Sequence, residues 1–316
     1  MKRTKRKEAI HKPVLIQEVV KALNLEKFAL LKRQARIIDA TVGTGGHTKK
    51  IIEYQAFVLG IDADKNILEN AREILSKACS AMNQTVRGSA PKRDFRDCFV
   101  LAQGNFKDID KIAREFRFSK VDGILFDLGI STLHLKSYKR GFSFENPSAK
   151  LDMRLDPDTQ SVKASDLLNA LDKNQLSRLF GEIIGKIASR RLAGSIYTKR
   201  KTKPFKTVSD LLAVVNSVKA RKKLHPATLA FLALRIATNS ELVNLKVALP
   251  KALSLLKTGG RLAIISFHSG EDRIVKNFYQ ESRQKIINKK PVTPGTAEIS
   301  ENPSARSAKL RVLEKI

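Results

Sequence analysis

The stretch "IIDATVGTGGHTKKIIEYQAFVLGIDAD" at residues 37–64 decides the fold. An apolar pair ends in Asp39, and a tight glycine turn at 43–46 precedes a stretch with helical character. A second apolar run, 57–61, ends at Asp62. This order predicts a strand, a helix and a second parallel strand, with a glycine loop after the first strand and an acid after the second.

Such a unit is typical of proteins that bind an adenosine-bearing cofactor. The glycines let the backbone approach the ligand, and the acid accepts hydrogen bonds from the ribose hydroxyls. Nicotinamide cofactors and S-adenosylmethionine both carry adenosine. The unit alone therefore fits either class of enzyme, and other parts of the chain have to discriminate between them.

Length and composition indicate an ordinary globular protein. The 316 residues, 42% of them hydrophobic, suffice for one large domain or two modest ones. No apolar run reaches the length of a membrane span, and the basic start at 1–7 lacks the apolar core of a signal peptide. Cys79 and Cys98 form no CxxC motif, so we expect neither a metal site nor a disulfide framework. The sequence predicts a reduced, cytoplasmic protein that does not bind membranes.

The charge of the chain indicates a polyanionic partner. Sixty Lys and Arg residues face 31 Asp and Glu residues, which gives a net charge of +29. The excess is clustered, because residues 183–209 contain no acid and a second basic group follows at 219–223. Nucleic acid is favoured over an anionic membrane, since the basic stretch lacks a strong apolar face. The basic residues predicted to contact RNA are Arg190, Arg191, Lys199, Arg200 and Lys201.

Further apolar runs extend the predicted sheet. Residues 98–102 and 121–126 are typical of strands buried on both faces, and 259–269 is a later strand introduced by a Gly-Gly turn. The fold class is therefore α/β, with a doubly wound, mostly parallel sheet.

The middle of the chain has a different sequence pattern. Helical spacing predicts helices over 161–180, 207–218 and 227–239, the last with Pro226 in its first turn. We expect this part to be a basic helical insertion that recognises RNA. The predicted domains are a discontinuous sheet domain, 1–134 with 226–316, and an insertion, 135–225.

The motif "ILFDLGIS" places Asp127 at the end of the fourth strand, with Gly129 in the following turn. In doubly wound sheets, ligands meet the protein at this edge. Gly45, Asp62 and Asp127 should therefore emerge side by side. A simple strand-ending turn is the alternative interpretation of this motif.

The motif "SFHSGEDR" at 266–273 follows the later strand and makes His268 a candidate catalytic residue. Two other interpretations compete with it. His268 can be an orienting hydrogen-bond partner, or the motif can be a helix start capped by Ser269 with Asp272.

The motif "RGFSFENPSAKLDMRLD" at 140–156 combines two aromatic residues with a charge cluster. Phe142 and Phe144 beside basic residues suit stacking on an unpaired base. The charge cluster consists of Asp152, Arg154 and Asp156, and a small satellite core with a structural salt bridge explains the motif equally well.

Taken together, these motifs occur in the order of a known family. The matching segments, in chain order, are "HKPVLIQEV" (11–19), "DATVGTGGHT" (39–48), "GIDAD" (60–64), "GNF" (104–106), "DGILFDLGIS" (122–131), "RGFSF" (140–144), "LDMRLD" (151–156), "HPAT" (225–228), "ALRI" (233–236), "GGRLAIISFHS" (259–269), "EDRIVK" (271–276) and "NPSARSAKLRV" (302–312). The chain resembles, over nearly its whole length, the bacterial 16S ribosomal RNA (cytosine-N4)-methyltransferases known as MraW or RsmH.

The resemblance implies a class I S-adenosylmethionine-dependent fold with a helical insertion. It also implies N4-methylation of a cytidine in the decoding region of 16S ribosomal RNA, with a partly assembled 30S particle as the substrate. The family's next cofactor contact is a glutamine, at whose position this chain has His134. Carried over by position, the family's other cofactor contacts are Gly45, Gly46, His47, Asp62, Phe106 and Asp127.

The chain also departs from the family pattern in its insertion and in the helix that follows. Ile183 replaces a glutamate, Leu229 and Leu232 replace polar residues, and Gly270 replaces a leucine. The cofactor loop keeps its pattern. An RNA-binding homologue that has lost catalysis is therefore an alternative function, while a nicotinamide-dependent oxidoreductase leaves the charge unexplained.

The chemistry suggests roles for the candidate residues. The cytosine amine is a poor nucleophile, and an acceptor for its hydrogens favours the reactive nitrogen. We assign this role to Asp127 or to the backbone carbonyls just after it. Asp152 and His268 are further candidates for taking the proton. The motifs contain no cysteine, which disfavours a covalent route. Phe142, Phe144 or Phe267 would hold the unstacked base.

Overall fold

The computed structural model describes residues 12–85, 98–136, 139–215 and 226–316. The chain forms two compact units. We call Met1–Gly129 with Ala248–Ile316 the sheet unit, and Ile130–Val247 the helical unit. The insertion is thus longer than the predicted 135–225. The reason is that α11 (Pro226–Thr238) contributes its apolar face to the core of the helical unit.

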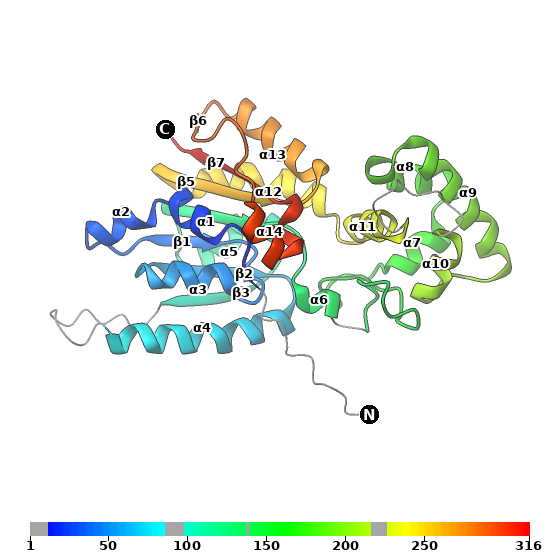
Figure 1. The fold of residues 1–316 in the computed structure, drawn as a ribbon, viewed down its shortest axis with the longest axis horizontal. Coiled ribbons are helices and arrows are strands. Elements are labelled where there is room, and N and C mark those ends of the chain that lie inside the picture. Colours follow the sequence, from blue (N-terminus) through cyan, green and yellow to red (C-terminus); the bar gives the residue numbers. More distant parts are fainter. Residues whose placement is uncertain (1–11, 86–97, 137–138, 216–225) are drawn as a thin grey trace. The chain divides into compact units, whose positions relative to one another are not determined.

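The sheet unit is built on seven strands in the order β3-β2-β1-β4-β5-β7-β6 (Figure 1). The first five strands of the chain are parallel, and β7 runs antiparallel to β5 and β6. The strands are β1 (Arg36–Asp39), β2 (Phe57–Asp62), β3 (Phe99–Gln103), β4 (Val121–Asp127), β5 (Leu256–Ser266), β6 (Lys285–Ile286) and β7 (Lys309–Glu314). This topology confirms the predicted doubly wound class I methyltransferase fold.

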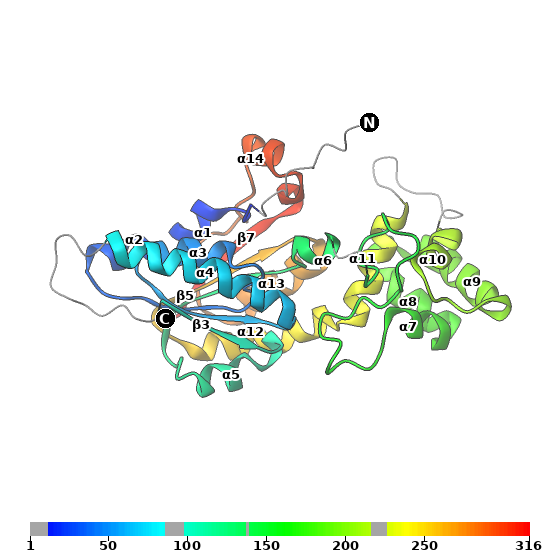
Figure 2. The same cartoon turned by 90° about the horizontal axis from the view of Figure 1, so that it is seen from below.

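Helices cover both faces of the sheet, which explains why its central strands are apolar throughout. In Figure 2, α1, α3 and α4 lie on one face and α5 lies on the other. The helices of this unit are α1 (Ile16–Ala22), α2 (Leu25–Leu30), α3 (Gly46–Glu53), α4 (Lys65–Thr85), η2 (Phe106–Asp108), α5 (Ile109–Glu115), α13 (Ser269–Glu281), α14 (Thr296–Glu301) and η3 (Pro303–Ser307), while α12 (Glu241–Leu255) runs across the division between the units.

The two cysteines differ from the sequence-based expectation. Cys79 on α4 and Cys98 just before β3 form a disulfide, with their Cα atoms 5.9 Å apart. The expectation of unpaired thiols was wrong because α4 packs against β3. Residues that are distant in sequence therefore meet beside the edge strand.

The helical unit has its own apolar core. The predicted helix over 161–180 is two helices, because Leu171 is extended and Asp172 starts a new helix. The Asp172 carboxylate accepts from the N–H groups of Asn174 and Gln175 at 2.8 Å. The helices here are α6 (Thr132–Lys136), α7 (Ala164–Ala170), α8 (Lys173–Ile184), α9 (Lys186–Thr202), α10 (Val208–Val215) and α11.

None of the helices in the described part of the chain combines the length and the apolar character that a membrane span requires. No group of three or more His, Cys, Asp or Glu side chains in the same residues is arranged to hold a metal ion.

Gly141 gives a test of the helical unit. Its φ is +71°, and an added Cβ would lie 2.5 Å from the backbone oxygen of Lys150. We expect Gly141→Ala to lower the free energy of unfolding by about 3 kcal/mol or more, since the left-handed backbone and the clash both act. Urea unfolding followed by circular dichroism measures the loss.

Gly259→Ala is the matched control. Gly259 also has a positive φ, +78°, but no described atom lies within 4 Å of its added Cβ. Gly259→Ala should lower the free energy of unfolding by only about 1 kcal/mol, from the backbone conformation alone. Equal losses in the two variants would contradict the clash at Gly141.

Candidate active site

The carboxyl ends of the parallel strands bring the predicted cofactor residues to one rim of the sheet unit. The N–H of Gly43 donates to Asp62 Oδ2 over 3.1 Å. The N–H of Asp127 donates to the hydroxyl of Thr41 over 2.6 Å. The glycine loop after β1 therefore contacts both the acid at the end of β2 and the acid at the end of β4. This convergence is the geometry expected from the sequence.

The glycine loop requires glycine for two reasons. Gly43 and Gly45 have φ values of +53° and +85°, which side chains disfavour. A Cβ on Gly45 would also lie 3.1 Å from the side chain of Leu75, and one on Gly46 would lie 3.3 Å from Pro13. The loop is thus enclosed between α4 and the segment before α1, and it leads into the N-terminus of α3.

The chemistry of these residues fits an adenosine-bearing cofactor. Asp62 holds the loop through Gly43 and also accepts from the N–H of Asp64 at 2.9 Å. A carboxylate accepts about four hydrogen bonds, so an orientation fixed by amides suits the recognition of a ribose diol. Backbone N–H groups at the start of α3 add donors beside it.

His47 and Asp127 form the central pair of the rim. His47 Nδ1 lies 3.2 Å from Asp127 Oδ2, and His47 Nε2 lies 2.8 Å from the carbonyl oxygen of Val14. Both partners can only accept hydrogen bonds, so both ring nitrogens carry a proton and the ring is an imidazolium. Only 5% of the His47 side chain is exposed. Asp127 Oδ1 is also buried and has no hydrogen-bond partner among the described residues.

Burial and charge act in opposite directions on His47. Burial by itself lowers the pKa of the imidazole, but Asp127, Asp39 and the Val14 carbonyl outweigh it and raise that pKa to about 8. The sequence suggested a cofactor contact for His47. Because its side chain is fully engaged, the backbone of His47 is the part that can face a ligand.

Asp39 is a buried acid that the sequence analysis did not assign to the site. It lies beneath the glycine loop and accepts from the hydroxyl of Thr48 over 2.6 Å. Burial raises the pKa of Asp39 to about 6, although Thr48 and His47 act to lower it. The threonines on both sides of the glycine turn were the available signal, since a buried acid needs donors.

Two aromatic residues belong to the same rim. Phe106 follows β3 in η2 and packs edge-on against Phe126, with the ring centroids 5.8 Å apart. Phe267 follows β5, and an added Cβ on Gly129 would lie 3.6 Å from its ring. Phe267 is thus beside the turn that follows Asp127.

His268 is engaged at the start of α13. Its Nδ1 accepts from the N–H of Glu271 at 3.4 Å, and its Nε2 lies 3.1 Å from Glu271 Oε1. The helix cap is therefore His268 with Glu271. The expected pair of Ser269 with Asp272 is wrong, because the Asp272 carboxylate accepts from Arg311 at 2.7 Å instead.

The other predicted site residues lie in the helical unit. His134 is buried against Phe142, with ring centroids 5.2 Å apart. Phe142 is only 6% exposed, and Phe144 packs edge-on against Phe231. The prediction that Phe142 stacks on a base is therefore wrong, because its ring belongs to the core of this unit. The satellite core was the better of the two interpretations.

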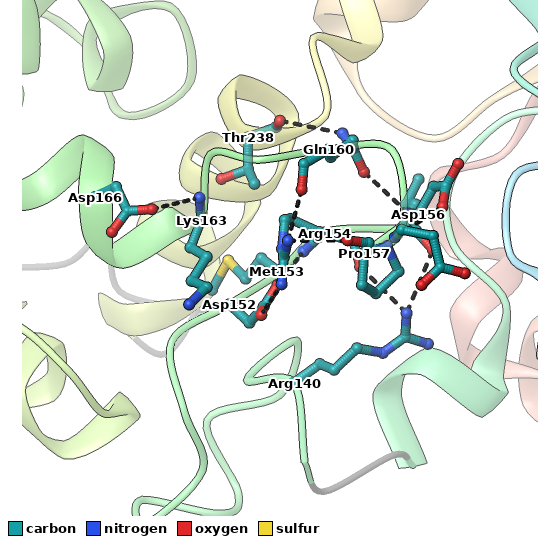
Figure 3. Close-up of polar contacts among 12 residues, drawn as sticks. Arg140, Asp152, Met153, Arg154, Asp156, Pro157, Gln160, Lys163, Asp166 and Thr238 are labelled. Atoms are coloured by element: carbon teal, nitrogen blue, oxygen red, sulfur yellow. Dashed lines mark hydrogen bonds and ion pairs between the residues drawn. The ribbon is translucent and has the colours of Figure 1, made fainter.

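Asp152 belongs to a closed ionic network in the same unit (Figure 3). Its two oxygens accept from Arg154 Nε and Nη2 at 2.7 and 2.8 Å. Arg154 also donates to the carbonyl oxygens of Pro157 and Gln160, and Arg140 donates to the carbonyl of Arg154. Burial acts to raise the pKa of Asp152, but Arg154 outweighs it and lowers that pKa. A carboxylate held in this way is a poor proton acceptor.

The basic helix α9 presents most of its predicted RNA contacts to solvent. The exception is Arg200, whose Nη1 donates to the carbonyl oxygens of Leu168 and Leu171 and so closes the end of α7. These bonds give Arg200 a structural role, and its RNA contact stays a prediction. The second basic group, 219–223, lies outside the described residues. The exposed basic residues of α9 are Lys186, Arg190, Arg191, Lys199 and Lys201.

The pH dependence of stability tests the His47 pair. The folded pKa of about 8 exceeds the ordinary 6.5, so the stabilisation is complete below about pH 6.5 and is lost as the pH rises through 8. We expect the free energy of unfolding of wild type to exceed that of His47→Gln at pH 6.5. This excess should be smaller at about pH 9, by about 1–2 kcal/mol. Asp39 titrates lower, near 6. Urea unfolding across this range measures the difference, and a constant gap would contradict the imidazolium.

Comparison with known proteins identifies the family of the chain. Residues 8–316 match the family model described as the MraW methylase family. The Ribosomal RNA small subunit methyltransferase H of Dictyoglomus thermophilum is 42% identical over 313 residues, which cover 98% of this chain and 97% of that protein. The protein of the same name from Persephonella marina is 42% identical over 316 residues, covering 97% and 99%. The chain therefore belongs to the MraW methylase family, which confirms the expected S-adenosylmethionine-dependent methyltransferase over the nicotinamide-dependent oxidoreductase.

Proposed function

We propose that this protein methylates the N4 amine of a cytidine in the decoding region of 16S ribosomal RNA. The substrate would be the 30S subunit or a late assembly intermediate, which implies a cytoplasmic location. Similarity to enzymes named as small-subunit methyltransferases supports the class of RNA. The basic charge of the chain supports a polyanionic substrate.

The single observation that carries the chemistry is the carboxylate of Asp127. One of its oxygens is held by His47, and the other is buried without a described partner. A buried acceptor without a partner costs free energy, and a ligand that donates a hydrogen bond to it would remove this cost. The amine of cytosine has two hydrogens to donate, and it fits this acceptor.

We assign a separate role to each residue of the rim. When bound, S-adenosylmethionine supplies an electrophilic methyl group. The glycine loop and Asp62 would hold its adenosine part, with Phe106 beside them. Asp127 would accept a hydrogen bond from the cytosine amine, which favours the pyramidal nitrogen of the transition state. The imidazolium of His47 would hold the Asp127 carboxylate in a fixed orientation.

The base would be held by an aromatic ring of the same rim. Phe267 is our candidate, because it lies against Gly129 in the turn after Asp127. Phe142 is buried in the other unit. For the final proton, Asp127 is favoured over Asp152, because the ion pair with Arg154 occupies both oxygens of that carboxylate. His268 stays a second candidate, because its buried Nε2 makes no hydrogen bond within the described residues.

Replacing Asp127 with Asn tests the chemistry. The amide keeps the shape of the side chain but is a weaker acceptor, and it loses the ionic contact with His47. We expect turnover to fall by about 100-fold or more, with cofactor affinity nearly unchanged. Methyl transfer from labelled S-adenosylmethionine to 30S particles, with the nucleoside identified by mass spectrometry, measures turnover. Equilibrium dialysis measures cofactor affinity.

Glu73→Gln, an exposed acid on α4, is the control. Near-normal turnover in Asp127→Asn would remove Asp127 from the chemistry. Wild-type protein that binds the particles but leaves no N4-methylcytidine would support the alternative function, an RNA-binding homologue without catalysis.

The RNA contact of α9 is tested by salt dependence. We expect Arg190→Ala with Arg191→Ala to weaken binding to 30S particles and to flatten the plot of log affinity against log salt by roughly 1–2 units, because two phosphate contacts are lost. Lys77→Ala with Lys111→Ala removes two exposed charges from the sheet unit and is the matched control. An unchanged slope in the α9 variant alone would overturn this contact.

A further inference from the structure

The peptide group between Val14 and Leu15 links the active-site pair to the C-terminal part of the chain. Its carbonyl oxygen accepts from His47 Nε2 over 2.8 Å. Its N–H donates to Glu298 Oε1, on α14, over 2.7 Å. Carbonyl and N–H point in opposite directions in a trans peptide, so a partner on each side fixes the orientation of the whole group.

This peptide group needs an external restraint. Leu15 has φ 53° and ψ 39°, a left-handed conformation that costs a leucine about 1–2 kcal/mol. No side chain caps α1 at this position. The carboxylate of Glu298 supplies a charge-assisted hydrogen bond to the N–H of Leu15, which stabilises this conformation.

The packing around this contact is tight on the side of the cofactor loop. Val14 and Leu15 are 3% and 1% exposed and share the core of the sheet unit with residues of η3 and β7. Pro13 lies against Gly46, at the start of α3. A movement of the Val14 carbonyl would therefore be transmitted to the glycine loop as well as to His47.

We propose that Glu298 is a positioning residue for methyl transfer, which acts through the Val14–Leu15 peptide and His47 to orient the Asp127 carboxylate. This inference rests on the proposed function of Asp127. The order of contacts is Glu298 to the peptide N–H, the peptide carbonyl to His47 Nε2, and His47 Nδ1 to Asp127 Oδ2. Each group is held by the one before it, and Asp127 Oδ1 is left to face the substrate.

The hydrogen bonds from Glu298 through the peptide group to His47 reinforce one another. A carboxylate that accepts from the peptide N–H makes the peptide carbonyl a stronger acceptor, because linked hydrogen bonds polarise one another. The stronger carbonyl stabilises the protonated ring of His47. The charged groups that face this ring are the carboxylates of Asp127 on β4 and Asp39 on β1.

The experiment compares three variants of the full chain. Glu298→Ala removes the acceptor, and Glu298→Gln keeps an oxygen that accepts from the same N–H. Glu301→Ala removes a neighbouring acid whose ion pair with Lys12 is exposed on both sides, 62% and 67%. We expect kcat on 30S particles to fall about 10-fold in Glu298→Ala, with KM and cofactor affinity within about two-fold. The other two variants should stay near wild type.

A second measurement does not depend on the substrate. Nitrogen-15 NMR of the His47 ring gives its titration midpoint, which should be lower in Glu298→Ala and unchanged in Glu298→Gln and Glu301→Ala. An unchanged midpoint in Glu298→Ala would overturn the inference. So would equal loss of kcat in the alanine and glutamine variants, because hydrogen bonding would then not be the cause. If wild type failed to methylate cytidine while the midpoint moved as expected, the proposed function would fail and the link from Glu298 to His47 would stand.

Discussion

The contact between the His47 imidazolium and the Asp127 carboxylate is the constraint on which the rim of the sheet depends. Parallel strands deliver Asp39, Asp62 and Asp127 to the same edge, so the fold itself gathers negative charge there. Two of these acids flank His47, and neither His47 nor Asp39 is appreciably exposed. A buried carboxylate without a cation or donors is strongly destabilised. The protonated ring resolves this conflict for Asp127.

The local sequence follows from the same constraint. The hydroxyls of Thr41 and Thr48 each make a hydrogen bond that the rim needs, Thr41 as an acceptor and Thr48 as a donor. Thr48 satisfies Asp39, while Thr41 accepts from the backbone of Asp127 and fixes the end of β4. The glycines between them let the loop turn back over the sheet without a side chain in the way. The residues of this short segment therefore suit both the turn of the loop and the acids of the rim.

How far the sequence predicted the molecule depended on distance along the chain. The five parallel strands, the glycine loop and the acids at the strand ends were predictable, because apolar runs and turn residues are local patterns. The contact of Glu298 with Leu15 joins residues 283 positions apart, and the disulfide depends on the packing of α4 against β3. No local pattern encodes either one. Phe142 looked exposed because polar residues flank it, but the apolar face of α11 belongs to the same core.

Residue type alone does not distinguish a catalytic acid from a structural one. In this chain the hydrogen-bond partners of the two acids make the distinction. Asp152 and Asp127 both lie within sequence motifs that contain charged residues or glycine, and both are partly buried beside a cation. Both oxygens of Asp152 are taken by Arg154, whose remaining donors close on backbone carbonyls, so the network is complete without a ligand. Asp127 has one oxygen held and one left as an acceptor. An imidazolium has a single N–H to offer on each side, whereas a guanidinium offers a fork. The choice of histidine at position 47 is therefore what keeps an acceptor open at the rim while still neutralising its charge.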